Sequence, residues 1–155
     1  KGIPMGGDLT AAPAGQSLSL MMTASKDPQS GNLDRLQVVK GWVDKDNQTF
    51  EKIYNVAWSG LRKLTAEGTL PPVGNTVDVA DASWTNSIGE PQLAVVWTDP
   101  DFDSNQRSFY YVRALEIPTP RWTAYDAKRF GESMNNEVPM TIQERAYSSP
   151  IWYTP

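Results

Sequence analysis

The sequence predicts a mainly β protein: an antiparallel β-sandwich of immunoglobulin-like architecture, with one or two short helices near the C-terminus. Three observations lead to this prediction. Several short runs alternate apolar and polar residues, as strands with one buried face do. Clusters of Gly, Pro, Asp, Asn and Ser separate these runs at short intervals. The chain contains little helical periodicity and no repeat of 20–50 residues.

Composition supports one globular domain. The chain has 155 residues, 39% of them hydrophobic, with 6 Trp, 6 Tyr and 4 Phe, which suits a folded core rather than disorder. Its net charge is −4 and it has no basic stripe, which argues against a nucleic-acid partner. No apolar run approaches the roughly 20 residues that a membrane span needs.

The chain has no cysteine and no histidine. This excludes disulfides, thiolate chemistry and the usual Ser-His-Asp and Cys-His mechanisms. It also removes the commonest zinc ligand. Catalysis by carboxylates, Lys or Tyr stays open, although no pairing of an acid with a base points to it.

The first residues predict a lead-in rather than part of the core. Residues 1–16 are rich in Gly, Ala and Pro and begin at Lys1 without an initiator Met. We interpret them as a segment arriving from a missing upstream domain, and residues 17–155 as a single β-sandwich domain. The Gly6-Gly7 pair suits a tight turn or close approach to another backbone segment, although a plain linker is favoured.

The next three runs predict a strand followed by a hairpin. Ser17–Ser25 alternates in hydrophobicity, and Leu33–Val43 and Thr49–Ser59 flank one polar loop. Trp42 and Trp58 lie in phase on the two hairpin strands. Cross-strand core packing explains them better than a sugar-binding platform does.

Two further strands are predicted after a surface crossover. They are Asn75–Trp84 and Gln92–Thr98, and the continuous apolar run of the second suggests a central position. In the polar loop that follows, Asp99, Asp101, Asp103 and Asn105 alternate like calcium ligands. Ser104 replaces the required Gly, however, and Tyr110 replaces the final Glu. A surface turn is therefore favoured.

Ser108–Trp122 contains the clearest strand. Phe109, Tyr111, Arg113 and Leu115 fall on one face, and Tyr110, Val112, Ala114 and Glu116 on the other. Pro118 and Pro120 are expected to stop the ladder, because neither can donate a backbone N–H.

The sequence pattern changes after Trp122, in the C-terminal part of the chain. Thr123–Phe130 predicts a short helix with Thr123 as a possible N-cap and Gly131 as its end. Thr141–Ala146 suits another helical turn. Tyr147–Tyr153 predicts a final edge strand with Pro150 near its start.

Five residues stand out as a ligand- or partner-binding site: Arg113, Glu116, Arg121, Trp122 and Tyr125. Arg113 is in phase with presumed core-facing residues, so it would need a carboxylate partner if buried. Arg121 is suited to grip an anionic group, but an internal salt bridge is the favoured alternative. No catalytic residue and no metal ligand is predicted.

Seven blocks carry a family resemblance: KGIPMGGDL, NLDRLQVVKGW, EKIYNVAWSG, LPPVGNTVDV, VWTDPDFD, FYYVRALEIPTPRWTAYDAKRFG and ERAYSSPIWYTP. In this order they resemble the C-terminal part of the bacterial domain of unknown function 3604 family, over essentially the whole chain. The segments YYVRALEI and AYSSPIWY look like the terminal strand pair of related hydrolases. This resemblance implies that residues 118–145 form an excursion between the two strands of that pair.

The resemblance implies a context. Family members are longer and often carry an export signal, which implies a periplasmic or secreted location. Their upstream part is similar to metal-dependent hydrolases of the polymerase-and-histidinol-phosphatase type, whose metals are held mainly by His and carboxylates. A divalent metal would therefore belong to the upstream domain, and no cofactor is expected in this chain.

We therefore expect a non-catalytic C-terminal accessory domain of a metal-dependent hydrolase. It would pack on the upstream catalytic domain and border its active site through Pro118–Arg129 and Lys1–Leu9. The alternative is a carbohydrate- or surface-binding β-sandwich module, which predicts a line of exposed aromatic rings.

Overall fold

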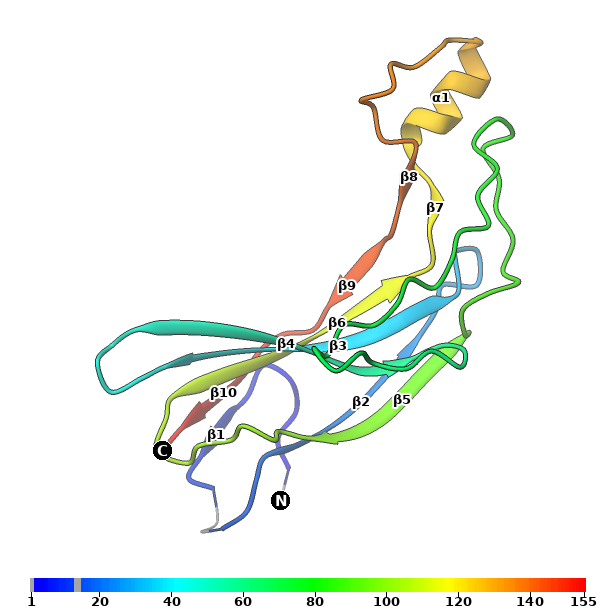
Figure 1. The fold of residues 1–155 in the computed structure, drawn as a ribbon. Helices are drawn as coiled ribbons and strands as arrows, with labels where there is room; N and C mark the ends of the chain where they lie inside the picture. Colours follow the sequence, from blue (N-terminus) through cyan, green and yellow to red (C-terminus); the bar gives the residue numbers. More distant parts are fainter. Residues whose placement is uncertain (1, 13–14) are drawn as a thin grey trace.

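The computed structural model describes residues 2–12 and 15–155. Lys1, Pro13 and Ala14 lie outside the described residues. Of the predicted lead-in, residues 1–16, the structure therefore describes residues 2–12, 15 and 16. The chain is mainly β with one short helix (Figure 1), which confirms the predicted fold class; the immunoglobulin-like arrangement stays a prediction. The described part of the chain holds no helix that is long and apolar enough to cross a membrane.

The elements follow one another as β1 (Asp8–Thr10), β2 (Ser19–Ser25), β3 (Leu33–Val43), β4 (Thr49–Trp58), β5 (Gln92–Thr98), β6 (Ser108–Glu116), β7 (Thr119–Pro120), α1 (Trp122–Phe130), β8 (Thr141–Ile142), β9 (Arg145–Tyr147) and β10 (Ile151–Thr154). The largest sheet has the strand order β1-β10-β6-β3-β4, and β9 also pairs with β6. All of its pairs are antiparallel except β1 with β10.

The predicted hairpin is confirmed as β3 and β4, which pair antiparallel from Val43↔Thr49 to Arg35↔Trp58. Its two tryptophans lie at opposite ends. Trp42 packs across the hairpin against Phe50, with ring centroids 5.5 Å apart, whereas Trp58 lies opposite Arg35. The two tryptophans are therefore not a packing pair.

The second layer is a two-stranded sheet of β2 and β5. Tyr54 of the large sheet and Trp97 of β5 meet with ring centroids 4.9 Å apart. The core between the layers consists of Leu18, Leu20, Met22, Leu33, Leu36, Val38, Leu93, Tyr110 and Tyr153. The expected central position of β5 is wrong: among the described strands β5 pairs only with β2. Its burial alternates, so that Leu93 is buried while Val96 is 67% exposed.

Strand β6 lies between β3 and β10, and Tyr110 points into the core. Val112 and Ala114 pack against the same core. Phe109, Tyr111 and Arg113 therefore face outward, and the expectation that Arg113 lies in phase with core-facing residues is wrong. Both faces of this strand carry large apolar side chains, so alternation alone could not identify the inner one.

Two other expectations are wrong. Residues 75–84 form a loop with an isolated bridge between Asp78 and Ser83 rather than a strand. In this loop Asp78 Oδ1 accepts a bond from the Asp81 amide, and Ala82 has a φ of 48°, so the chain turns back on itself. Residues 141–146 contribute to β8 and β9 rather than to a helical turn.

The excursion forms an arm that projects from the sheets, with α1 at its tip (Figure 1). Contrary to expectation, Pro120 takes part in strand pairing. Strand β7 pairs with β8 at Thr119↔Ile142 and Pro120↔Thr141. Arg121, not Thr123, is the N-cap. The Thr123 hydroxyl instead donates to Pro139 O at 2.6 Å. Gly131 ends the helix with a φ of 67°, as predicted.

The lead-in contributes to the large sheet. The Gly6 amide donates to Pro150 O at 2.9 Å, and the Trp152 amide donates to Gly7 O at 3.1 Å. These bonds confirm the close backbone approach that the glycine pair suggested, and strand β1 then continues parallel to β10.

Candidate functional site

The five predicted site residues fall at separate places. Arg113 and Glu116 lie on β6, whereas Arg121, Trp122 and Tyr125 lie at the start of α1, at the far end of the arm (Figure 1). The structure therefore does not bring them together into one site. It presents two exposed surfaces, one on the helix and one on the large sheet.

The first surface is the helix face, which consists of Trp122, Tyr125, Arg129 and Phe130. At about 100° per residue, Trp122, Tyr125 and Arg129 share the side of α1 away from the buried Thr123 and Ala124, and Phe130 lies at the edge of this face, next to Thr123. Trp122 is 61% exposed, Tyr125 45% and Phe130 65%.

Arginine side chains lie beside the aromatic rings of the helix face. Arg121 Cζ lies 5.7 Å from the centroid of the Trp122 ring, and Arg129 Cζ lies 5.7 Å from that of Phe130. No carboxylate of the described residues lies within 4.0 Å of Arg121. Its guanidinium is thus placed over an aromatic ring rather than in an internal salt bridge.

The helix is tied to the loop of residues 75–84. Lys128 Nζ donates to Asp81 Oδ1 at 2.7 Å and to Asp81 O at 2.8 Å. The hydrogen bond from Lys128 holds the pKa of the Asp81 carboxyl below its usual range. Together with the Arg121 amide, which donates to Met140 O at 2.9 Å, these contacts fix how the arm presents its aromatic rings.

The second surface is the outer sheet face, which carries an aromatic row of Trp152, Phe109, Tyr111 and Tyr147. Successive ring centroids along this row are 5.3, 6.4 and 6.2 Å apart. The register explains the row, because Trp152 lies opposite Phe109 and Tyr147 lies opposite Arg113. Trp152 is 48% exposed and Tyr147 57%, so the row is open to solvent at both ends.

Gly41 makes room for the row. A Cβ at Gly41 would lie 2.3 Å from Phe109 Cζ and 2.4 Å from Cε1. The Phe109 ring therefore lies across the neighbouring strand at its paired residue. Glycine is required here by the close approach of the ring, not by an unusual φ.

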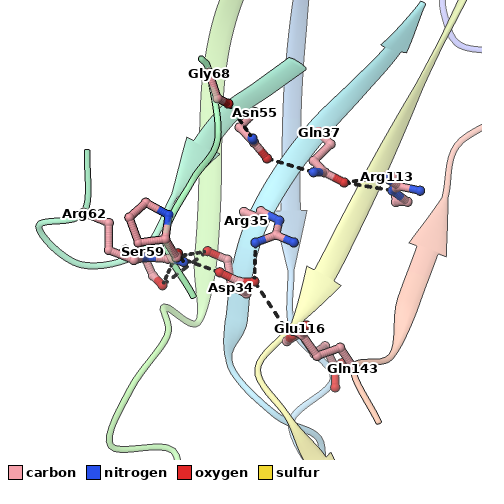
Figure 2. Close-up of polar contacts among 11 residues, drawn as sticks. Asp34, Arg35, Gln37, Asn55, Ser59, Arg62, Gly68, Arg113, Glu116 and Gln143 are labelled. Carbon is pink, nitrogen blue, oxygen red and sulfur yellow. Dashed lines mark hydrogen bonds and ion pairs between the residues drawn. The ribbon is translucent and has the colours of Figure 1, made fainter. Parts of the chain in front are cut away.

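A chain of polar side chains continues the outer sheet face beyond the aromatic row (Figure 2). Asn55 donates to Gly68 O at 3.4 Å, and Gln37 donates to Asn55 Oδ1 at 2.8 Å. Arg113 then donates to Gln37 Oε1 through Nε at 2.9 Å and through Nη2 at 2.6 Å.

The partner of Arg113 is thus a neutral amide; Arg113 is only half-buried, so the condition under which we expected a carboxylate partner is not met. Within the described ranges no carboxylate lies within 4.0 Å of its guanidinium. The contact with Gln37 uses two of the five N–H donors of Arg113, and the other three do not bond to Gln37. Arg113 is half-buried beside Tyr147, so its charge and free donors are available to an anionic group.

Glu116 is held by hydrogen bonds to other parts of the chain. Its Oε2 accepts a bond from Ser30 Oγ at 2.5 Å, and its carbonyl accepts one from Gln143 at 2.9 Å. Nearby, the buried Asp34 carboxylate lies 2.7 Å from Arg62 and 3.2 Å from Arg35 (Figure 2). These contacts tie loops to the end of the sheet next to the arm.

A buried ionic cluster lies at the end of the two sheets away from the arm. Asp99 is 1% exposed, and its Oδ2 accepts bonds from Lys40 Nζ at 2.6 Å and from Tyr110 Oη at 2.7 Å. The surface-turn interpretation is therefore wrong for Asp99. The sequence did contain a signal for this contact. Lys40 is in phase with Leu36 and Val38 on β3, so a buried Lys40 needed a partner of opposite charge.

The same cluster continues to the surface at Asp101, whose Oδ2 accepts bonds from Lys52 and from Tyr54. Burial raises the pKa of Tyr110 and of Tyr54. Both phenols therefore keep their protons at neutral pH and are not activated as bases. Within residues 2–12 and 15–155, no group of three or more His, Cys, Asp or Glu is arranged to hold a metal ion.

The comparisons with known proteins gave one match. A family model described as "Protein of unknown function (DUF3604)" matches residues 1–155. No curated protein and no solved structure matches the chain.

Proposed function

The chain belongs to the DUF3604 family over its whole length, and on that premise we propose that it is a non-catalytic accessory domain of a longer metal-dependent hydrolase. It packs on the catalytic domain upstream and borders the active site there. The resemblance to family members with such an upstream part supports this proposal. The divalent metal belongs to that upstream domain, and the export signal common in the family would make the protein periplasmic or secreted.

The observation that carries the proposal is the helix face. Three aromatic side chains of this nine-residue helix are between 45% and 65% exposed: Trp122 and Tyr125 on the helix face, and Phe130 at its edge. Exposed aromatic groups of this kind commonly mark interaction surfaces, and Trp, Tyr and Arg dominate the binding energy of protein interfaces.

The arm is suited to docking because its conformation is fixed. The β7–β8 pair, the Lys128–Asp81 ion pair and the Gly131 cap all hold α1 before any partner binds. A surface that is already ordered loses less conformational entropy on binding. The proposed border of residues 118–129 includes the exposed rings of Trp122 and Tyr125, which supports the proposal.

The test uses the 155-residue chain and the polypeptide upstream of it, produced separately. Binding is measured by calorimetry for the wild type, for Trp122→Ala and for Trp152→Ala, which removes an exposed Trp from the other surface. We expect Trp122→Ala to weaken binding about tenfold or more, that is by at least about 1.4 kcal/mol, and Trp152→Ala to change it less than twofold. Absence of any binding by the wild type would overturn the proposal.

A second candidate function, carbohydrate binding, is favoured by the outer sheet face. Its aromatic row, exposed at Trp152 and Tyr147, supports this candidate, and Arg113 adds a cation with no carboxylate partner among the described residues. The ligand would be an oligosaccharide with a carboxylate or sulfate, which a guanidinium binds well.

The same two tryptophan variants test this second function with the opposite expectation. Trp152→Ala should abolish binding of acidic oligosaccharides in calorimetry, and Trp122→Ala should leave it unchanged. Arg113→Gln should remove the preference for acidic over neutral sugars. If the wild type binds neither class at millimolar concentration, the carbohydrate function is rejected.

A further inference from the structure

A groove of about 840 Å³ runs along one edge of strand β2. Every residue from Gln16 to Ala24 lines it. Successive side chains of a strand point to opposite faces, so a groove that contacts all of them follows the edge of the strand. The facing walls come from residues 2–5, from Leu9 and from the inward side of β6, including Tyr110 and Val112.

This edge of β2 carries unpaired backbone groups. The Asp99 amide donates to Leu18 O, and the Lys26 amide donates to Pro91 O, so the even-numbered residues of β2 are bonded to β5. In an antiparallel ladder the intervening residues direct their N–H and C=O groups to the opposite edge. Those of Ser19, Met21 and Thr23 therefore face the groove, and no described residue pairs with them.

The edge also lacks the features that usually prevent strand addition. Exposed edges are commonly protected by Lys, Pro or a β-bulge. The sequence of β2, SLMMTAS, has neither residue, and its pairing with β5 runs without a register shift. Met21, on this strand, is 87% exposed. The edge is thus open to a further strand.

The groove is neutral and mostly apolar. None of its described wall residues is Asp, Glu, Lys or Arg, although charged residues make up 21% of the chain. A strand that fills it must therefore be uncharged and must direct apolar side chains toward Leu18, Leu20 and Met22. Residues 2–5 form part of the wall, so a polypeptide that precedes residue 1 emerges beside the groove.

We propose that an extended, uncharged segment of the upstream domain adds to the free edge of β2 as an antiparallel or parallel strand and fills this groove. This inference rests on the proposed accessory function, and it identifies a contact separate from the helix face. Main-chain bonds to Ser19, Met21 and Thr23 supply affinity, and the apolar groove selects the side chains, as in other cases of strand addition.

The test exploits a matched pair of residues. Met21 and Val96 lie opposite each other in the β2–β5 ladder, and both are exposed, at 87% and 67%. Each directs its amide away from the ladder, Met21 toward the groove and Val96 toward the other edge. Met21→Pro and Val96→Pro therefore remove equivalent outward N–H groups and leave the ladder bonds in place.

Binding of the separately produced upstream polypeptide is measured for both variants. We expect Met21→Pro to weaken it about tenfold or more, from one lost hydrogen bond and the clash of the proline ring with the added strand, and Val96→Pro to change it less than twofold. Equal binding by the two variants overturns the inference while the accessory function stands. Failure of the wild type to bind overturns the accessory function itself.

Amide hydrogen exchange of the wild type gives a second readout that needs no variant. The amides of Ser19, Met21 and Thr23 should exchange rapidly in the chain alone and slowly in the complex. Exchange that stays rapid in the complex rejects strand addition at this edge. A wild-type chain that forms a dimer by itself, abolished by Met21→Pro, would assign the edge to a second copy instead and so also overturn the inference.

Discussion

Lys40 Nζ and Asp99 Oδ2 lie 2.6 Å apart, and both side chains are almost completely buried. Lys40 comes from β3, in the large sheet, and Asp99 directly follows β5, in the small one. Lys40 also donates to Asp101 O at 2.7 Å, and the Tyr110 hydroxyl donates to the same carboxylate oxygen of Asp99. This pair therefore joins the large sheet to the small one at one end.

Removing one partner of this pair should be severely destabilising. Asp99→Ala leaves the Lys40 ammonium buried without a counter-charge, for which we expect a loss of about 3–5 kcal/mol in the free energy of unfolding. Urea unfolding followed by tryptophan fluorescence measures it. The double variant Lys40→Met with Asp99→Ala should lose less than Asp99→Ala alone. A double variant that is less stable than the single one would contradict this account.

Stability should fall at alkaline pH. Burial, together with the hydrogen bond to Asp99, raises the pKa of Tyr110 in the folded protein above the value of about 10 in the unfolded chain. The folded state then holds this proton more tightly, so its stabilising effect is complete below about pH 10 and is lost as the pH rises further. Urea midpoints between pH 8 and 11 measure the effect.

Tyr110→Phe is the control for that pH dependence. It removes the titrating group, so the loss of stability between pH 9 and pH 11 should be smaller than in the wild type, even though the variant loses one bond to Asp99 at all pH values. Identical pH profiles for the two proteins would show that Tyr110 does not cause the alkaline loss.

Gly41→Ala should disturb the aromatic row. Its Cβ would lie 2.3 Å from Phe109 Cζ, so the ring must move, and overpacking of this kind costs about 1–3 kcal/mol. A double-mutant cycle with Phe109→Ala checks the cause, because Gly41→Ala should cost much less once the ring is gone. Equal costs in both backgrounds would show that the ring is not the obstacle.

Gly131→Ala should loosen the arm without affecting the two larger sheets. Gly131 has a φ of 67°, and nothing lies within 4 Å of where its Cβ would be. The expected cost of about 1–2 kcal/mol is therefore backbone strain alone. Amide exchange should accelerate within α1 and stay unchanged in β3. Gly131→Asn is the control, and it should have a smaller effect because Asn tolerates this conformation better.

Local patterns predicted the elements whose signals are complete within a short stretch. The β3–β4 hairpin has two alternating runs around one polar loop, and Gly131 follows a short helical run, so both were confirmed. Residues 75–84 also contain alternating apolar residues, but hydrogen bonds within the turn at Asp78 prevented a strand there. Strand β5 has a continuous apolar run, yet the structure exposes one of its faces.

The candidate surfaces were predicted only in part. Trp122 and Tyr125 were among the five residues that the sequence singled out, and both are exposed. Gln37 and Asn55 were missed, since a neutral amide gives no signal until its neighbour across the sheet is known. The contact between Arg113 and Gln37 was missed for the same reason.

The sequence by itself determined the mainly β class, the hairpin and the family. Those properties follow from periodicity, turn residues and ordered motifs, all of which are local. The tertiary structure alone decided which face of β6 is inward, which residues form the aromatic row and which edge of β2 stays unpaired. Each of these depends on strand register and on how far one sheet covers another, and contacts between residues distant in the sequence set both.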